Sequence, residues 1–354
     1  MRNDRKKRKR LQQTKCKEDE ALNAVSVRIQ KEAIQKDRFL ALARKYYLKW
    51  RQVNEAHKTL QSKANNLSMS SRFGTNPRLF LPQSTISDKN IPEISRCHLM
   101  APKDKDGKDT TVHLGHGVFG KCEKMFYKGI PVAIKLYNNL SSIQDIRREA
   151  DVMARCSHPS IPHIFGVNLT QKPYFLVSYF YGINNCTKSC TLYHALRSPT
   201  ITLTKYCAGK IMLELCQALQ HLHLKQLLHR DIKSDNILLT TLHTGFHPML
   251  IDFGKSIEVS EAISKKKCLS AHEQDDYRKK YRHIAPEIIL GQPPSFASDL
   301  FSFGVVMSDV SGNIPFELCF FEGQRKCLEE DPKLRCSVSY LLNQLETNAS
   351  LCNK

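Results

Sequence analysis

The chain has 354 residues, of which 41% are hydrophobic and 25% charged, and this ordinary globular composition excludes a fully disordered or fibrous protein. No apolar run approaches the roughly 20 residues that a membrane-spanning helix needs, and no apolar segment follows the basic N-terminus, which excludes a secretory signal peptide. The 13 cysteines are scattered without a CxxC pair. We therefore expect no zinc site or disulfide framework, and an intracellular protein, cytoplasmic or nuclear.

Positive charge is concentrated at the N-terminus. Residues 1–70 hold 19 Lys and Arg against 7 Asp and Glu, which gives +12 of the total +20. This excess indicates an arm with an anionic partner, such as nucleic acid, an acidic lipid surface or an import receptor. The basic run at 5–10 predicts import of some of the protein into the nucleus, although a solvated helix start or a lipid contact explains it equally well.

Residues 1–65 are predicted to be a basic helical extension. No Gly or Pro occurs before residue 74, and apolar residues recur at steps of three and four from Leu22 to Leu60. This pattern predicts one helix over 17–63 that joins two copies as a homodimer, with Glu32 and Lys36 interrupting the seam. The alternative is a lone amphipathic helix packed on its own domain. One Trp and two Tyr at seam positions argue against nucleic acid as the partner.

The composition changes after this helix. Residues 66–107 contain four prolines among Ser, Asn and Lys and are predicted to be a linker. Short strand-like runs follow at 111–114, 121–127, 131–135 and 174–178, with a helix over 141–156 that Ser141 caps. Helical periodicity then dominates at 203–224, 299–310 and 338–345, and 349–354 form a tail. Strands followed by helices predict an α+β fold with two lobes rather than a doubly wound sheet.

The first chemical signal is a glycine-rich turn at Gly115, Gly117 and Gly120. Such turns bind phosphates because backbone N–H groups approach the oxygens closely. A dinucleotide fold would place a helix directly after Gly120, whereas residues 121–127 alternate like a strand. The pattern therefore favours a hairpin folded over a nucleotide. Lys135 follows fifteen residues later, and Glu149 in the next helix could hold its ammonium group.

The strongest signal is His229-Arg230-Asp231, followed by Lys233, Asn236 and then Asp252-Phe253-Gly254. In these motifs, their order and their spacing, the chain resembles the eukaryotic protein kinase family, in its serine/threonine or tyrosine-kinase-like serine/threonine group. Ala285-Pro286-Glu287, Asp299 and Arg335 extend the resemblance, which covers residues 108–348. It implies a bilobal protein-kinase fold, with a small antiparallel-sheet N-lobe carrying one helix and a larger helical C-lobe.

The resemblance also implies roles for individual residues in a Mg²⁺-dependent transfer from ATP to a protein substrate. Lys135 would hold the α- and β-phosphates, and Glu149 would hold Lys135. Asp252 and Asn236 would bind Mg²⁺, Asp231 would accept or orient the substrate hydroxyl, and Lys233 would steady the γ-phosphate. The ATP site would comprise Gly115, Gly117, Gly120, Cys122, Ala133, Lys135, Val177 and Leu238. Lys233 in its motif favours Ser or Thr over Tyr as the acceptor.

Two departures from the family pattern leave an alternative open. The Gly-Thr that usually precedes Ala-Pro-Glu is replaced by Lys279-Lys280, and that Thr normally bridges residues of the Asp231 and Lys233 type. The interval from Ser302 to Arg335 is also short, where the family usually places a substrate-docking helix. The alternative function is therefore a pseudokinase scaffold that binds partners through the N-terminal helix.

Overall fold

The computed structural model describes residues 91–183, 189–242, 245–263, 271–314, 316 and 318–351. The chain divides into two compact units, residues 1–80 and 81–354, and every described residue belongs to the second. The helix predicted at 17–63, its dimer seam and the basic run at 5–10 therefore lie outside the described residues. Within the described residues, no helix is long and apolar enough to cross a membrane.

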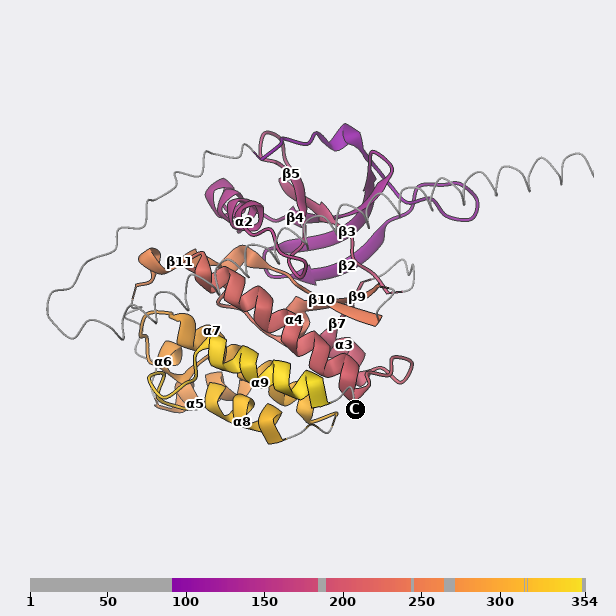
Figure 1. Ribbon diagram of the computed structural model, residues 1–354. Helices are drawn as coiled ribbons and strands as arrows, with labels where there is room; N and C mark the ends of the chain where they lie inside the picture. Colours follow the sequence, from indigo (N-terminus) through magenta and orange to yellow (C-terminus); the bar gives the residue numbers. More distant parts are fainter. Residues whose placement is uncertain are drawn as a thin grey trace, which may run out of the picture. The chain divides into compact units, whose positions relative to one another are not determined.

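The N-lobe is built on an antiparallel sheet, most of whose strands are labelled in Figure 1. Its strands are β1 (Leu99–Met100), β2 (Val112–Gly117), β3 (Gly120–Tyr127), β4 (Ile130–Tyr137), β5 (Ile164–Asn168) and β6 (Phe175–Tyr179). They lie in the order β1-β3-β4-β6-β5, and β2 also pairs with β3. The predicted strands at 111–114, 121–127, 131–135 and 174–178 are all confirmed within a few residues.

The helix of the N-lobe is α2 (Ile143–Arg155), and its cap differs from the prediction. Ser142, not Ser141, is the N-cap: its side chain accepts a hydrogen bond from the backbone N–H of Asp145, and the carboxylate of Asp145 accepts one from the N–H of Ser142. The reciprocal pair is completed by Asp145, three positions after Ser142. Ser141 has Gln144 at the same spacing, which a capping box also accepts, so the sequence pattern alone does not decide between the two serines.

Residues 91–107, which the sequence analysis assigned to the linker, belong instead to the folded domain. Ile94 is 1% exposed, and its backbone N–H donates to the carbonyl of Val167 in β5. A short 3₁₀ helix, η1 (Arg96–His98), leads into β1, where Leu99 pairs with Tyr127 of β3. The prolines that suggested a linker are compatible with this edge position, because Pro is tolerated at the borders of sheets.

The C-lobe is mainly helical (Figure 1). Its helices are α3 (Leu192–Arg197), α4 (Lys205–Leu224), α5 (Ala271–Lys280), α6 (Pro286–Ile289), α7 (Phe296–Ser311), α8 (Leu318–Cys327) and α9 (Val338–Leu351). The helices predicted at 203–224, 299–310 and 338–345 correspond to α4, α7 and α9. Together with the antiparallel sheet of the N-lobe, they confirm the predicted bilobal α+β fold.

Short strands and turns, most of them between α4 and α5, carry the polar motifs. β9 (Ile237–Leu242) pairs with β10 (Gly245–Leu250) and β7 (Cys190–Thr191), and β8 (Leu227–Leu228) pairs with β11 (Ile257–Glu258). The 3₁₀ turns are η2 (Ser234–Asn236), η3 (Phe253–Lys255) and η4 (Val259–Glu261). This arrangement brings the segments around residues 231, 236 and 252 together.

Two apolar clusters hold these elements in place. The larger one includes Met153 of α2, Leu219 of α4, Phe253 of η3 and Val306 of α7, so it joins the N-lobe helix to the C-lobe. The smaller cluster packs Ile94 and Leu99 against buried side chains of β4 and β6. Burial of each large apolar side chain contributes roughly 1.5–3 kcal/mol.

Candidate active site

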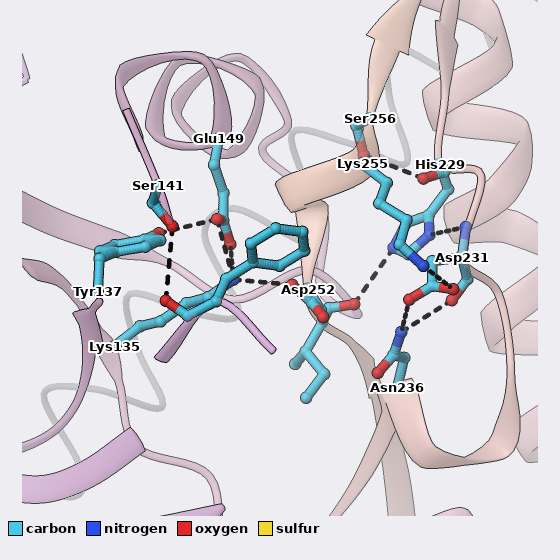
Figure 2. Close-up of polar contacts among 12 residues, drawn as sticks. Lys135, Tyr137, Ser141, Glu149, His229, Asp231, Asn236, Asp252, Lys255 and Ser256 are labelled. Atoms are coloured by element: carbon cyan, nitrogen blue, oxygen red, sulfur yellow. Dashed lines mark hydrogen bonds and ion pairs between the residues drawn. The ribbon is translucent and has the colours of Figure 1, made fainter. Parts of the chain in front are cut away.

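One lysine and two carboxylates connect the N-lobe to the C-lobe (Figure 2). The ammonium of Lys135 on β4 lies 2.8 and 2.9 Å from the two carboxylate oxygens of Glu149 on α2. It also donates to Asp252 Oδ1 at 2.7 Å, and the hydroxyl of Tyr137 donates to Glu149 Oε2 at 2.8 Å. The predicted Lys135–Glu149 pair is therefore present, and Tyr137 is a member of this cluster that the sequence analysis missed.

The charges of this cluster reinforce one another. Burial alone would lower the pKa of Lys135, but the charges of Glu149 and Asp252 outweigh burial and raise it above its ordinary value. Burial alone would raise the pKa of Asp252, but the charge and hydrogen bond of Lys135 hold it below its ordinary value. Lys135 and Asp252 are therefore both ionised at neutral pH, as expected of opposite charges that are partly buried side by side.

The glycine-rich segment is a β-hairpin, as predicted, because β2 pairs with β3 through Gly117 and Gly120. Gly120 has a φ of +153°, and a Cβ there would collide with the backbone carbonyl of Leu136 in β4. The turn is tied down by Asn138, whose amide donates to the carbonyl of Val118 at 2.7 Å. Gly115 and Gly117 are exposed, and a Cβ on either would meet no atom within 4 Å.

Strand register decides which residues of the sheet share a face with Lys135. Ala133 lies two residues before Lys135 on β4 and therefore on the same face. Cys122 of β3 pairs directly with Lys135, and burial raises the pKa of its thiol to about 11, so it stays protonated. Leu238, on β9 of the C-lobe, is only partly buried, which suits a residue on the floor of a cleft.

The assignment of Val177 to this face is wrong. Val177 pairs with Ile134, and both side chains are fully buried in the small cluster beneath Ile94, on the face of the sheet opposite to Lys135. Ser178, its neighbour, pairs with Ala133 and is partly exposed. Because side chains alternate along a strand, an error of one position moves a residue to the other face.

On the C-lobe, Asp231 lies with Lys233 and Asn236 in one loop. Lys233 Nζ is 3.1 Å from Asp231 Oδ2, and the amide of Asn236 donates to the same oxygen at 3.0 Å. The Asn236 amide also donates to the backbone carbonyl of Asp231, and neither bond uses its amide oxygen. The backbone N–H of Ile251 donates to the carbonyl of Asn236, which places Asp252 beside this loop.

A buried carboxylate on α7 fixes the shape of the loop. Asp299 is 1% exposed, and its two oxygens accept hydrogen bonds from the backbone N–H groups of His229 (2.8 Å) and Arg230 (2.9 Å). Arg230 has a φ of +66°, a left-handed conformation that costs energy in a non-glycine residue. Asp299 stabilises this strained turn, and the turn directs Asp231 into the site.

Two residues that the sequence analysis did not assign also contact Asp231. Lys255 Nζ lies 2.9 Å and His283 Nε2 lies 3.3 Å from Asp231 Oδ1. Burial alone would raise the pKa of Asp231, but the contacts with His283 and Lys255 and the charge of Lys233 outweigh burial and hold it well below its ordinary value. His283 thus reaches Asp231 in the segment where the expected Thr is replaced.

The segment from Asp252 to Glu287 is anchored at its end by a buried ion pair. Two nitrogens of Arg335 lie 2.6 and 2.8 Å from the two oxygens of Glu287, and the side chains are 0% and 4% exposed. Arg335 also donates to the carbonyl of Ala297. Glu287 and Arg335 both belong to the motifs that carry the family resemblance, and their pair holds the end of this segment on the C-lobe.

The oxygen atoms of the site suit a divalent cation only in combination with a ligand. Among the described residues, no group of three His, Cys, Asp or Glu side chains could hold a metal ion. Asp252 has two carboxylate oxygens, of which Oδ1 accepts from Lys135, and Asn236 adds its amide oxygen. Magnesium in phosphate-binding sites is typically held by one or two carboxylates together with phosphates and water, so these residues fit such an ion.

Comparison with known proteins identifies a matching protein family. The model described as "Protein kinase domain" matches residues 109–345. The chain is 27% identical over 58% of its length to "Probable serine/threonine-protein kinase gdt4" of Dictyostelium discoideum, covering 12% of that protein. It is 27% identical over 57% of its length to "Serine/threonine-protein kinase VIK" of Arabidopsis thaliana, covering 45%. The chain thus spans less than half the length of these two relatives.

Proposed function

Because the chain belongs to the protein kinase family, we propose that it transfers the γ-phosphate of ATP to serine or threonine hydroxyls of protein substrates, with Mg²⁺ as cofactor. The observation that carries this proposal is the Lys135 ammonium held between Glu149 and Asp252 at 2.7–2.9 Å, next to the Asp231 loop. Phosphoryl transfer asks the protein mainly to position groups and to neutralise charge, and this arrangement supplies both.

On the nucleotide side, Lys135 would hold the α- and β-phosphates, and Glu149 and Tyr137 keep its ammonium in place. The N–H groups of the Gly115–Gly120 hairpin would approach the phosphates, with Cys122 and Ala133 above the adenine and Leu238 below it. Asp252 and Asn236 would hold Mg²⁺, which when bound neutralises charge that develops on the phosphates.

On the acceptor side, Asp231 is ionised and would take or orient the proton of the attacking hydroxyl. Lys233, beside it, would steady the γ-phosphate. Serine or threonine as acceptor is supported by Lys233 in its motif and by the names of the relatives, which call them serine/threonine-protein kinases.

The test is a phosphorylation assay on the purified full chain with labelled ATP and a peptide array that offers Ser, Thr and Tyr acceptors. We expect label on Ser or Thr peptides, loss of labelling when EDTA removes the metal, and recovery when Mg²⁺ is added back. Labelling of Tyr peptides alone would contradict the acceptor assignment. If ATP binds but no peptide is labelled, the proposed enzymatic activity is contradicted.

A non-catalytic scaffold is the second candidate, and one observation favours it. Among the described residues, four donors contact the Asp231 carboxylate and occupy both of its oxygens, namely Lys233, Asn236, Lys255 and His283. A substrate hydroxyl must therefore displace a donor. The same assay separates the candidates, since a scaffold would bind partners without labelling any peptide.

Two further expectations concern residues outside the described part of the chain. We propose that residues 17–63 join two chains as a homodimer, which light scattering of the chain with and without residues 1–70 would test. We also propose that the protein works inside the cell, in the cytoplasm or the nucleus. A tagged chain without residues 1–10 should then lose nuclear signal, and an unchanged distribution would remove the import proposal.

A further inference from the structure

A hollow lies in the C-lobe beside the loop that carries His283. It is bounded by the end of α5, by α6, by one face of α7 and by the chain that follows α8. Its empty volume is about 730 Å³, part of which is open to solvent. None of the residues that form the Lys135 or Asp231 clusters lines it, so it is a separate feature of the surface.

The wall of the hollow on α7 is a stripe of side chains that lack full cover. Phe301, Val305 and Ser308 line the hollow and are only partly buried. Their neighbours on the other face of the same helix, Phe303 and Val306, are 2% and 0% exposed. Helix α8 packs on α7 and its Gln324 donates to the Ser308 hydroxyl at 2.9 Å, whereas Phe301 and Val305 line the hollow and stay partly exposed.

The floor and the opposite wall are apolar as well. Ile284, Pro286 and Ile289 come from the turn before α6 and from α6 itself. The guanidinium of Arg335 covers one side of the Phe301 ring, with its carbon 4.9 Å from the ring centroid. An apolar side chain that entered the hollow would exchange water for these groups, which is favourable in proportion to the apolar area covered.

The rim of the hollow is basic. Arg278 at the end of α5 and Arg282 in the following turn line the hollow, and both are exposed. Neither forms an ion pair within the described part of the chain. Glu330 supplies the one acidic side chain of the lining, and Lys279 and Lys280 lie between the two arginines in sequence. The rim therefore carries excess positive charge that favours a negatively charged ligand.

His283 connects this hollow to the catalytic carboxylate. Its flanking residues Arg282 and Ile284 line the hollow, while its own ring reaches Asp231 Oδ1 at 3.3 Å. Ser302 on α7 donates to the backbone carbonyl of His283 at 2.6 Å, which fixes the turn. Since consecutive Cα atoms are about 3.8 Å apart, the hollow begins one His side chain and one residue of backbone away from Asp231.

We propose that this hollow docks an acidic segment of the protein substrate, with an apolar side chain in the hollow and a neighbouring Asp or Glu against Arg278 and Arg282. The short separation from Asp231 places this anchor within a few residues of the accepting hydroxyl. This inference rests on the proposed phosphoryl transfer and adds a substrate class to it, namely acidic sequences that include an apolar anchor.

A positional peptide library tests the preference. In this assay the purified full chain is given peptides that have a fixed Ser or Thr and in which one neighbouring position, on either side, is varied at a time. We expect enrichment of Asp or Glu, and of Leu, Ile or Phe, at neighbouring positions close to the acceptor. The acidic preference should weaken as salt rises, because exposed charges are screened. Equal phosphorylation of basic and acidic peptides would overturn the proposal.

Two variants change the rim in opposite directions. Arg278→Glu with Arg282→Glu should raise KM for the preferred acidic peptide about tenfold, because attraction becomes repulsion at a partly exposed site. Its kcat, and its KM for a neutral peptide, should change little. Glu330→Gln should lower KM for the acidic peptide severalfold. Lys105→Glu with Lys108→Glu, an exposed charge reversal in the N-lobe, is the control and should leave KM unchanged.

Failure of docking and failure of phosphoryl transfer give different results. A fluorescent acidic peptide with Ala at the acceptor position reports binding without any reaction. Binding to the wild-type chain that the double arginine variant loses supports docking, even if no peptide is labelled. Labelled peptides whose acidic preference survives in that variant leave the proposed function intact and overturn the docking site. Absence of binding by the Ala peptide also overturns it.

Discussion

The nucleotide side and the acceptor side of the site are built on opposite charge balances. Around Lys135 stand two carboxylates, Glu149 and Asp252, so the three groups sum to −1. Around Asp231 stand Lys233 and Lys255, so these three sum to +1 before His283 is counted. A negative cluster suits a bound divalent cation, and a positive one suits a phosphoryl group in transfer. The two sides therefore divide the work of charge neutralisation.

The largest expected effect comes from releasing the anchor of the acceptor side. Arg335→Ala leaves Glu287 buried without its partner, which typically costs 3–5 kcal/mol in the free energy of unfolding. Chemical denaturation measures this loss. Arg325→Ala, which breaks an exposed pair with Glu329, is the control and should cost less than about 1 kcal/mol. Equal losses in the two variants would show that the buried pair is no anchor.

The substitution Lys135→Met disrupts the charged cluster on the nucleotide side of the site. The variant leaves Glu149 and Asp252 without their shared cation and removes the group proposed to hold the phosphates. We expect kcat/KM for ATP to fall about 100-fold or more, while binding of an acidic peptide persists. Steady-state kinetics and peptide anisotropy measure both. Lys105→Met is the control and should change neither quantity. If Lys135→Met weakened peptide binding as strongly as it lowers kcat/KM for ATP, the two sides of the site would not be separable.

The charge balance of the acceptor side is tested by Lys255→Met. Removing this contact raises the pKa of Asp231 from its depressed value towards the ordinary one. Since the ionised carboxylate is the active form, transfer in the variant should fail at a higher pH on the acid side than in the wild type. We expect the shift to be modest, because Lys255 is 46% exposed and solvent screens its charge. Identical acid limits in the pH–rate profiles would contradict a role for Lys255.

The smallest expected effect concerns the cap of α2, the helix that carries Glu149. Ser142→Ala removes a hydrogen bond to the N–H of Asp145 and should cost about 1 kcal/mol. Hydrogen exchange in the first turn of α2 and thermal unfolding measure it. Ser141→Ala should change little, because its hydroxyl makes only a 3.5 Å contact with the carbonyl of Phe119. A larger loss of stability in Ser141→Ala than in Ser142→Ala would identify Ser141 as the cap.

The difference between the two sides also explains what could be predicted from the sequence. Lys135, Glu149 and Asp252 stand in motifs with fixed order and spacing, and regular elements place each of them. Lys255 and His283 carry no such signal, because only the three-dimensional path of the chain brings them to Asp231, from 24 and 52 residues further along the sequence. Tyr137 was recognisable in principle, since it lies two residues beyond Lys135 on the same strand.

The two misplaced residues show where pattern reasoning is weakest. Val177 and Ser178 are adjacent in an apolar run, and nothing in that run marks which residue faces inward. The register of β6 follows instead from its pairing with β4 and from a bulge in β5 between Ile164 and Gly166. Ser141 and Ser142 are likewise adjacent, and each has a residue three positions later that can complete a capping box, Gln144 and Asp145, so the pattern does not distinguish them.

The most direct test of the account measures two quantities in one variant, Asp231→Asn. The substitution keeps the size of the side chain but removes the carboxylate that acts on the acceptor hydroxyl, and it leaves the Lys135 cluster untouched. We predict that peptide labelling falls by roughly 10²–10⁴-fold while the dissociation constant for ATP stays within about twofold of wild type. Wild-type turnover in this variant would contradict the assigned mechanism, and lost ATP binding would contradict the separation of the two sides.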